Sequence, residues 1–236
     1  MLQFEFLKLW RNNLTAVLFG YIGFIIVTYN VLVLVFKDAV WMEAWSGKIA
    51  ILIVSVMVDI IFWLAAMQIA EDMETGMIHL MRTSRNIVQY FAGKHVLLLL
   101  IMGVISIGIM ASRLSEPMLV LQFTLFTLLT TILMISAGVF FTMLVKKQNS
   151  VMVAGSVVTG LLFATLMRLL LPTWNIPAIP GNPFNYIIKG LYDLLYPFNG
   201  SYDAVSLVSL SLFTFIVYLF FITLFYWFTY KKGFRL

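Results

Sequence analysis

The sequence predicts an all-α membrane protein with six transmembrane helices. Hydrophobic residues make up 62% of the 236 residues and charged residues only 11%, whereas soluble domains carry roughly 25% charge. Six apolar runs are each long enough to cross a hydrocarbon core of about 30 Å, and none alternates apolar with polar residues as a barrel strand would. The predicted spans are residues 14–36, 49–70, 87–111, 118–145, 151–171 and 204–230.

The distribution of Lys and Arg predicts that both termini are cytoplasmic. Cytoplasmic loops of membrane proteins are enriched in these residues. Five of the fifteen fall on the side opposite the two termini: Lys37, Lys48, Arg113, Arg168 and Lys189. Ten fall on the side of the termini: Lys8, Arg11, Arg82, Arg85, Lys94, Lys146, Lys147, Lys231, Lys232 and Arg235. The outer connections are therefore expected around Gly47, Glu116 and Gly200, and the net charge of +5 marks topology rather than nucleic-acid binding.

Composition also narrows the chemistry. The chain has no cysteine, which excludes disulfides, a thiol nucleophile and thiolate metal sites. Its two histidines, His79 and His95, are expected in or beside the cytoplasmic connector between spans two and three, with no third metal ligand around them. We therefore expect no metal site and no catalytic residue in this chain.

Three segments outside the spans have a pattern of their own. Residues 1–11 alternate polar and apolar side chains at helical spacing, which predicts an amphipathic elbow helix on the membrane surface. Residues 171–186 contain Pro172, Pro177, Pro180 and Pro183, and an amphipathic stretch over 187–196 follows, which predicts a short helical hairpin at the outer interface. Residues 71–85 form the most charged stretch.

The 71–85 stretch is predicted to form a short cytoplasmic helix that serves as a docking surface. Acidic residues open it and basic residues close it, as the macrodipole of a helix favours, and apolar residues between them give it one hydrophobic face. A solvated connector is the plainer interpretation. The acidic residues are Glu71, Asp72 and Glu74; the basic ones are Arg82 and Arg85; the apolar ones are Met77, Ile78, Leu80 and Met81.

The order of these elements resembles the ABC-2 family of ABC-exporter permeases, which have six spans, an elbow helix and a coupling helix between spans two and three. That family's coupling pattern is matched here by Glu71, Glu74, Gly76, Leu80, Ser84, Gly93 and Lys94. A second shared pattern is Pro172-Thr173-Trp174 followed by Asn182-Pro183-Phe184. The proline that usually precedes the coupling serine is replaced by Thr83.

The resemblance implies one transmembrane domain over residues 1–236, in the plasma membrane of a bacterium. The residues that would couple it to the ATPase are Glu71, Glu74, Gly76, Ile78, Leu80, Arg82 and Ser84. Its implied partners are ABC ATPase subunits and a second permease copy or paralogue. The sequence lacks G-x-x-x-x-G-K-[ST], so ATP and magnesium would bind the partner and this chain would not be an enzyme. Small members of the family export drugs, lipids and antimicrobial or cytolytic peptides; this chain is nearest the peptide-export or lantibiotic-immunity type.

Polar residues inside the spans are candidates for a substrate path. Asp59 is the one charged residue near the middle of a predicted span, where an ionised carboxylate costs about 2.5–3.5 kcal/mol. It either faces a cationic or hydrogen-bonding substrate group or is bonded to a neighbouring helix, and the sequence leaves both open. We assign Asn30, Thr127 and Thr131 to the same path, although most such groups form interhelical hydrogen bonds.

Small residues four apart suggest where helices approach one another. Ala16 with Gly20, and Ser156 with Gly160, are small-x-x-x-small pairs, for which we expect close packing of helices.

Two other functional classes were weighed. An ATP-independent secondary transporter or channel would more often show paired broken helices or several intramembrane ionisable groups. A rhomboid-like protease would need a G-x-S-x-G nucleophile and a histidine within the membrane, neither of which is predicted here.

Overall fold

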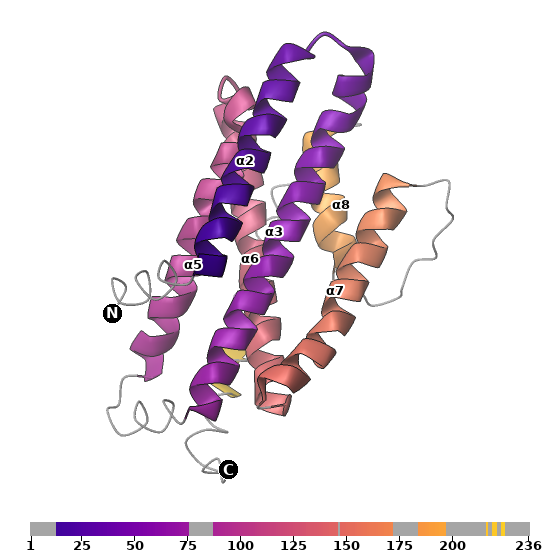
Figure 1. Ribbon diagram of the computed structural model, residues 1–236. Helices are drawn as coiled ribbons and strands as arrows, with labels where there is room; N and C mark the ends of the chain where they lie inside the picture. Colours follow the sequence, from indigo (N-terminus) through magenta and orange to yellow (C-terminus); the bar gives the residue numbers. More distant parts are fainter. Residues whose placement is uncertain are drawn as a thin grey trace.

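The computed structural model is a helical bundle, and it describes residues 13–75, 87–145, 147–171 and 184–196 with five further positions between 216 and 224. All regular structure in these residues is helical (Figure 1). The α-helices are α2 (Asn13–Val35), α3 (Val40–Glu74), α5 (Ile87–Ile109), α6 (Pro117–Val145), α7 (Gln148–Leu170) and α8 (Phe184–Leu195), and a 3-10 turn, η1, covers Ala111–Arg113.

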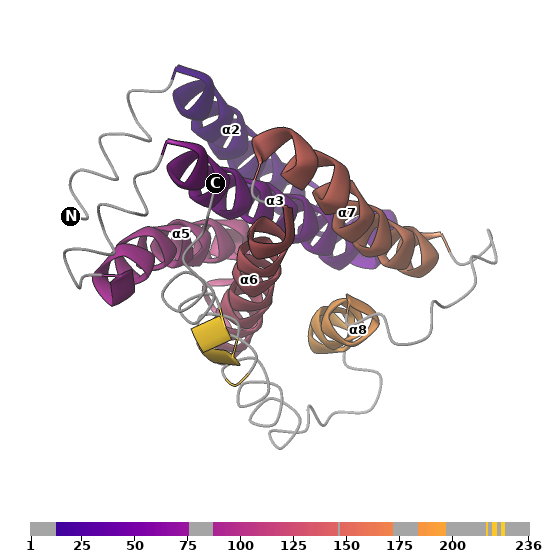
Figure 2. The same cartoon turned by 90° about the horizontal axis from the view of Figure 1, so that it is seen from below.

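The long helices run antiparallel to their sequence neighbours, because the connections between them are short. Residues 36–39 join α2 to α3, and residues 146–147 join α6 to α7. Seen end-on, α3 lies in the middle, with α2, α5, α6 and α7 around it and α8 beside α6 and α7 (Figure 2). Acidic residues at the end of α3 and Lys147 before α7 therefore lie at the same end of the bundle, opposite the α2–α3 turn.

Three helices are long and apolar enough to cross a membrane, over Val40–Glu74, Pro117–Thr142 and Asn149–Arg168. Within α2 and α5, Gly20–Val35 and His95–Ile109 are shorter apolar stretches. The outward-facing residues are also apolar, as at Phe24 (67% exposed) and Val104 (72%), which is the surface a hydrocarbon solvent requires. The sixth predicted span, the elbow 1–11 and residues 76–86 of the connector lie almost entirely or wholly outside the described residues.

Helix α3 is longer than predicted at both ends. It begins at Val40 rather than at residue 49, because hydropathy detects only the apolar part of a helix and residues 40–48 include exposed Trp41 and Trp45 and half-buried Lys48. The connection predicted around Gly47 is therefore residues 36–39. At the other end Glu71 and Glu74 belong to the last turn of α3 and not to the start of a separate helix. This corrects the dipole argument, since acidic groups are unfavourable at a helix C-terminus.

Helices α3 and α6 make the most extensive contact, and a glycine brings their backbones together. A Cβ atom added to Gly138 would lie 3.4 Å from the Ala66 nitrogen and 3.4 Å from the Phe62 carbonyl oxygen. One turn further along α6, the Thr142 hydroxyl donates to the Gly138 carbonyl of its own helix at 2.8 Å and lies 3.2 Å from the Ala66 carbonyl of α3. Close backbone approach of this kind is how helices gain van der Waals contact in lipid, where the hydrophobic effect does not drive them together.

Helix α7 packs on α3 through Gly155 and not through the predicted small pair. A Cβ atom at Gly155 would lie 2.6 Å from the Trp63 ring. Ser156 is exposed, and a Cβ atom at Gly160 would meet nothing within 4 Å. Gly20 of α2 is equally open. The close packing predicted at Gly20 and Gly160 is therefore wrong within the described part of this chain.

Helix α8 packs along the side of the bundle, next to α6 and α7, and does not lie across its end as predicted for the outer interface (Figure 2). It is strongly amphipathic, and its buried side packs against α3, α6 and α7. Near the start of α8, Asn185 contacts Thr165 of α7. Directly after its end, the ring of Tyr196 covers Gly47 of α3. The buried residues are Phe184, Ile188, Leu191, Leu194 and Leu195. The predicted amphipathic helix over 187–196 is confirmed in type; residues 172–183 of the predicted hairpin lie outside the described residues.

Single cysteines can test the topology, because the native chain has none. We expect Asp38→Cys and Glu116→Cys in intact cells to react with a membrane-impermeant maleimide added outside, since both residues are exposed at the same end of the bundle. Glu74→Cys should react only after permeabilisation. Labelling of Glu74→Cys from outside would invert the predicted orientation.

Gly155 and Gly160 form a matched pair on one helix. Gly155→Leu should lower the stability of the detergent-solubilised protein by about 1–3 kcal/mol, because the side chain overlaps the Trp63 ring. Gly160→Leu should leave the thermal midpoint nearly unchanged, since it projects into open space. Equal effects of the two substitutions would contradict this packing of α3 on α7.

Candidate intramembrane polar site

The candidate site is centred on Asp59, in the middle of α3. Its side chain is 9% exposed and faces α7. Apolar residues surround it on α3, and within the described residues it forms no ion pair. An aspartate at this depth is expensive and is by default a candidate functional residue.

A chain of two hydrogen bonds joins α3 to α7 at this point. The Trp63 indole Nε1–H donates to the Thr159 hydroxyl at 3.1 Å, and that hydroxyl donates to Asp59 Oδ1 at 2.7 Å. The direction is fixed, because an indole N–H can only donate and the Thr159 hydrogen must then go to the carboxyl group. Asp59 is thus an acceptor at Oδ1 whether or not it is ionised.

The site combines the two predicted alternatives for Asp59. The bond to Thr159 is the interhelical contact expected of a structural residue. A single hydroxyl donor, however, supplies no positive charge, so the ionised carboxylate has no counter-ion among the described residues. An ionised Asp59 would therefore take its counter-charge from a group other than the described residues.

Asn30 is fully engaged in joining α2 to α5. Its Nδ2 donates to the carbonyls of Ile26 at 2.9 Å and Gly108 at 2.8 Å, and its Oδ1 accepts from the Ser112 backbone N–H at 2.9 Å. This is the interhelical hydrogen bonding that the sequence suggested as the plainer role. Its assignment to a substrate path stays a prediction.

The threonines of α6 bond within their own helix. Thr127 donates to the Phe123 carbonyl at 2.9 Å and Thr131 donates to the Thr127 carbonyl at 2.7 Å. Both are fully buried, as a polar stripe inside the bundle should be. Within the described residues, neither hydroxyl donates to another helix, in contrast to the interhelical bonds expected for them. Asp59 accepts its bond from α7 and not from α6. Their path assignment is likewise untested by these contacts.

Only part of the predicted ATPase-coupling segment is described. Glu71 is half-buried and Glu74 is exposed in the last turn of α3, and Asp72 between them is buried. The Thr75 hydroxyl caps this end by donating to the Glu71 carbonyl at 2.9 Å. Gly76, Ile78, Leu80, Arg82 and Ser84 lie outside the described residues.

A polar cluster that sequence reasoning missed lies near the end of the bundle that holds the α2–α3 turn. The Tyr29 hydroxyl donates to the Ser46 carbonyl at 3.0 Å, and Arg113 Nη2 donates to the Ser46 hydroxyl at 3.4 Å. The Tyr196 hydroxyl accepts the Lys48 backbone N–H at 3.2 Å. Burial raises the pKa of Tyr196, so its phenol stays neutral at ordinary pH. This cluster ties α2, α3, η1 and the end of α8 together.

His95 corrects another prediction. It lies within α5 and is only 2% exposed, and not in the cytoplasmic connector. His79 lies outside the described residues. Among the residues that were placed, no group of three or more His, Asp or Glu side chains could hold a metal ion.

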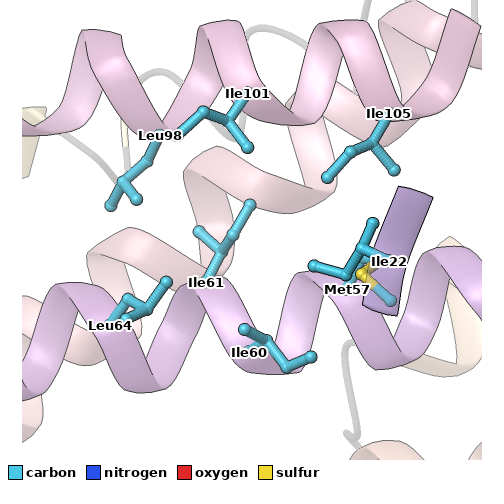
Figure 3. A pocket seen from close by; sticks show the side chains of 8 residues that line it. All are labelled: Ile22, Met57, Ile60, Ile61, Leu64, Leu98, Ile101 and Ile105. Carbon is cyan, nitrogen blue, oxygen red and sulfur yellow. The ribbon is translucent and has the colours of Figure 1, made fainter. Parts of the chain in front are cut away.

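An apolar cavity lies between α2, α3 and α5 (Figure 3). Its volume of about 10 Å³ is at the lower limit for a single water molecule. Every lining side chain is aliphatic or methionine, so nothing there could hold a water or a polar ligand. The lining residues are Ile22, Met57, Ile60, Ile61, Leu64, Leu98, Ile101 and Ile105. The cavity is a packing gap, and it leaves Asp59 as the chemically distinctive position.

No protein-family model, characterised protein or solved structure matches this chain. Its function is therefore argued from its own residues.

Thr159 and Thr127 provide a matched test of the hydrogen-bond chain. Thr159→Val should destabilise the protein by about 1–3 kcal/mol, because it leaves the Asp59 carboxyl and the Trp63 N–H without their shared partner. Thr127→Val should change stability by less than about 0.5 kcal/mol, since the Phe123 carbonyl keeps its helical N–H. Thermal unfolding in detergent measures both; a neutral Thr159→Val would mean that the chain of bonds is not formed.

Proposed function

We propose that this chain is the permease subunit of an ATP-driven exporter of the ABC-2 type. In this proposal it pairs with a second permease copy or paralogue in a bacterial plasma membrane, with both termini cytoplasmic. Separate ABC ATPase subunits bind ATP and magnesium. The exported substrate is hydrophobic or amphipathic: an antimicrobial or cytolytic peptide, a drug or a lipid.

The observation that carries the proposal is the continuity of α3. One helix of 35 residues holds Asp59 at its middle and Glu71 and Glu74 in its last turn. A polar group at membrane depth marks a path through the membrane. Glu74 is exposed and Glu71 half-exposed at this end, so a basic surface on a partner would be complementary in charge to it.

The last turn of α3 is also suitable as a contact surface. Glu74 is exposed and Glu71 is half-exposed, whereas Asp72 points inward and is 5% exposed. In this proposal the buried Asp72 holds the turn against the bundle, and Glu71 and Glu74 face the partner. Complementary charge across an interface of this kind sets partner choice and association rate more than affinity.

An ATP-independent secondary transporter is the second candidate, and α8 favours it. This helix has 12 residues and packs against three longer helices within the bundle. Half-length helices inside a bundle are typical of secondary transporters, in which they line the substrate site. Such a protein would work without an ATPase subunit, so the experiment below separates the two candidates.

The experiment is co-purification from the native cell. The tagged chain should retain a polypeptide that contains a G-x-x-x-x-G-K-[ST] motif, identified by mass spectrometry. The double substitution Glu71→Lys and Glu74→Lys should reduce the recovery of that polypeptide at least about tenfold, which corresponds to roughly 1.4 kcal/mol of binding free energy. The reason is that charge reversal places two positive groups against a basic surface.

Glu116→Lys is the matched control, because Glu116 is an exposed acid at the opposite end of the bundle. It should leave recovery unchanged. Normal membrane insertion of each variant is checked by its yield and by size-exclusion profile. Purification of an intact, transport-competent chain with no ATPase would overturn the exporter and support the secondary transporter.

A further inference from the structure

Asp59 is buried where α3 meets α7, and the described residues of α7 beside its hydrogen-bond donor are small. Thr159, its hydrogen-bond donor, is half-exposed. Ser156 and Gly160 lie next to Thr159 on the face of α7 that points away from the bundle, and both are exposed. A Cβ atom at Gly160 would have no neighbour within 4 Å. A group moving along this side of α7 could therefore reach the carboxyl.

The chemistry of this exposed edge of α7 selects for one kind of ligand. The Asp59 carboxyl, once ionised, would supply negative charge to a cation that reaches it, and its hydrogen-bond donor among the described residues is the uncharged Thr159 hydroxyl. The half-exposed Trp63 indole beside it can attract a cation through its ring face. Met152, Val153 and Val157 are 52%, 73% and 60% exposed on the same helix. The edge thus offers one anionic position within an apolar surface.

We propose that Asp59, Trp63 and the exposed edge of α7 form a binding site for an amphipathic amine, with its ammonium group at Asp59 and its apolar body along Met152, Val153 and Val157. This names the substrate class of the exporter, and as a transport site it rests on the proposed function. The binding itself does not require ATP or a second subunit.

The bond between Thr159 and Asp59 explains how one site serves both folding and binding. In the absence of ligand, the hydroxyl satisfies Oδ1 and the Trp63 N–H satisfies the hydroxyl. An ammonium group carries three donors and no acceptor, so it can approach the carboxyl without competing for the Thr159 hydrogen. The ammonium then supplies the missing counter-charge, which the hydroxyl cannot provide.

The probe is 1-pyrenebutylamine, with 1-pyrenebutanol as a neutral compound of the same ring and chain. Energy transfer from tryptophan to pyrene reports saturable binding to the purified full chain in nanodiscs. The amine should bind at least about tenfold more tightly than the alcohol. Asp59→Asn should abolish that preference and leave alcohol binding unchanged, because it removes the charge at nearly constant volume.

Three further variants keep the test decisive. Asp59→Glu should retain the preference for the amine. Gly160→Leu, which keeps the carboxyl and should fold normally, should weaken amine binding by covering the approach. Asp38→Asn, at an exposed acid far along the chain in the α2–α3 turn, should change nothing. If Asp59→Asn does not fold, the Asp59→Glu and Gly160→Leu pair decides the question alone.

The failure of this proposal differs from the failure of the exporter. Equal affinity for amine and alcohol in the native protein, or an amine preference that survives both Asp59→Asn and Gly160→Leu, would overturn the binding site whether or not an ATPase co-purifies. A change of oligomeric state in Gly160→Leu, with no amine preference in the native protein, would assign this edge to a second copy of the chain instead. Asp59-dependent amine binding without any ATPase would keep the site and reject the exporter.

Discussion

The close approach of α3 and α6 at Gly138 is the contact on which the rest of the bundle depends. Lipid is as apolar as the side chains, so burial by itself does not hold membrane helices together. Here the backbones come near enough for Gly138 to contact the Ala66 nitrogen and the Phe62 carbonyl. That contact fixes α3 in the centre. Helix α5 packs on one of the remaining sides of α3, and α7 and α8 pack on another.

Aromatic rings fill the spaces that other glycines leave. Gly155 lies under Trp63, Gly190 under Phe126 and Gly47 under Tyr196. In each case the partner belongs to another element, so the glycine sets the distance between two elements and the ring fixes their rotation. The polar groups obey a second rule, since Thr127, Thr131 and Ser136 all donate to carbonyls of their own helix. Other side chains, among them Asp59, Asn30, Tyr29 and Trp63, instead join helices through their polar atoms.

Sequence reasoning located the three helices that are long and apolar enough to cross a membrane, and the shorter apolar stretches of α2 and α5, because length and hydropathy suffice where the solvent is hydrocarbon. It shortened α3, since hydropathy stops where a helix leaves the lipid. It also identified Asp59, but not Thr159, which is 100 residues away in sequence. Helical spacing relates only residues that are close together in the sequence. For the same reason the small pairs at Gly20 and Gly160 were taken for contacts, whereas Gly155 and Gly47 face aromatic rings that no local pattern reveals.

Helix α3 contains no proline, and beyond Gly47 it contains no glycine. Its 35 residues form a rod of about 52 Å, at roughly 1.5 Å per residue. Asp59 and Glu71 are twelve residues apart on it, which is about 18 Å along the axis and one-third of a turn around it. Because an uninterrupted helix has no hinge between these points, a rotation imposed at one of them reaches the other as torque. Asp59 in the middle of α3 and the acidic last turn of the same helix are therefore expected to rotate together.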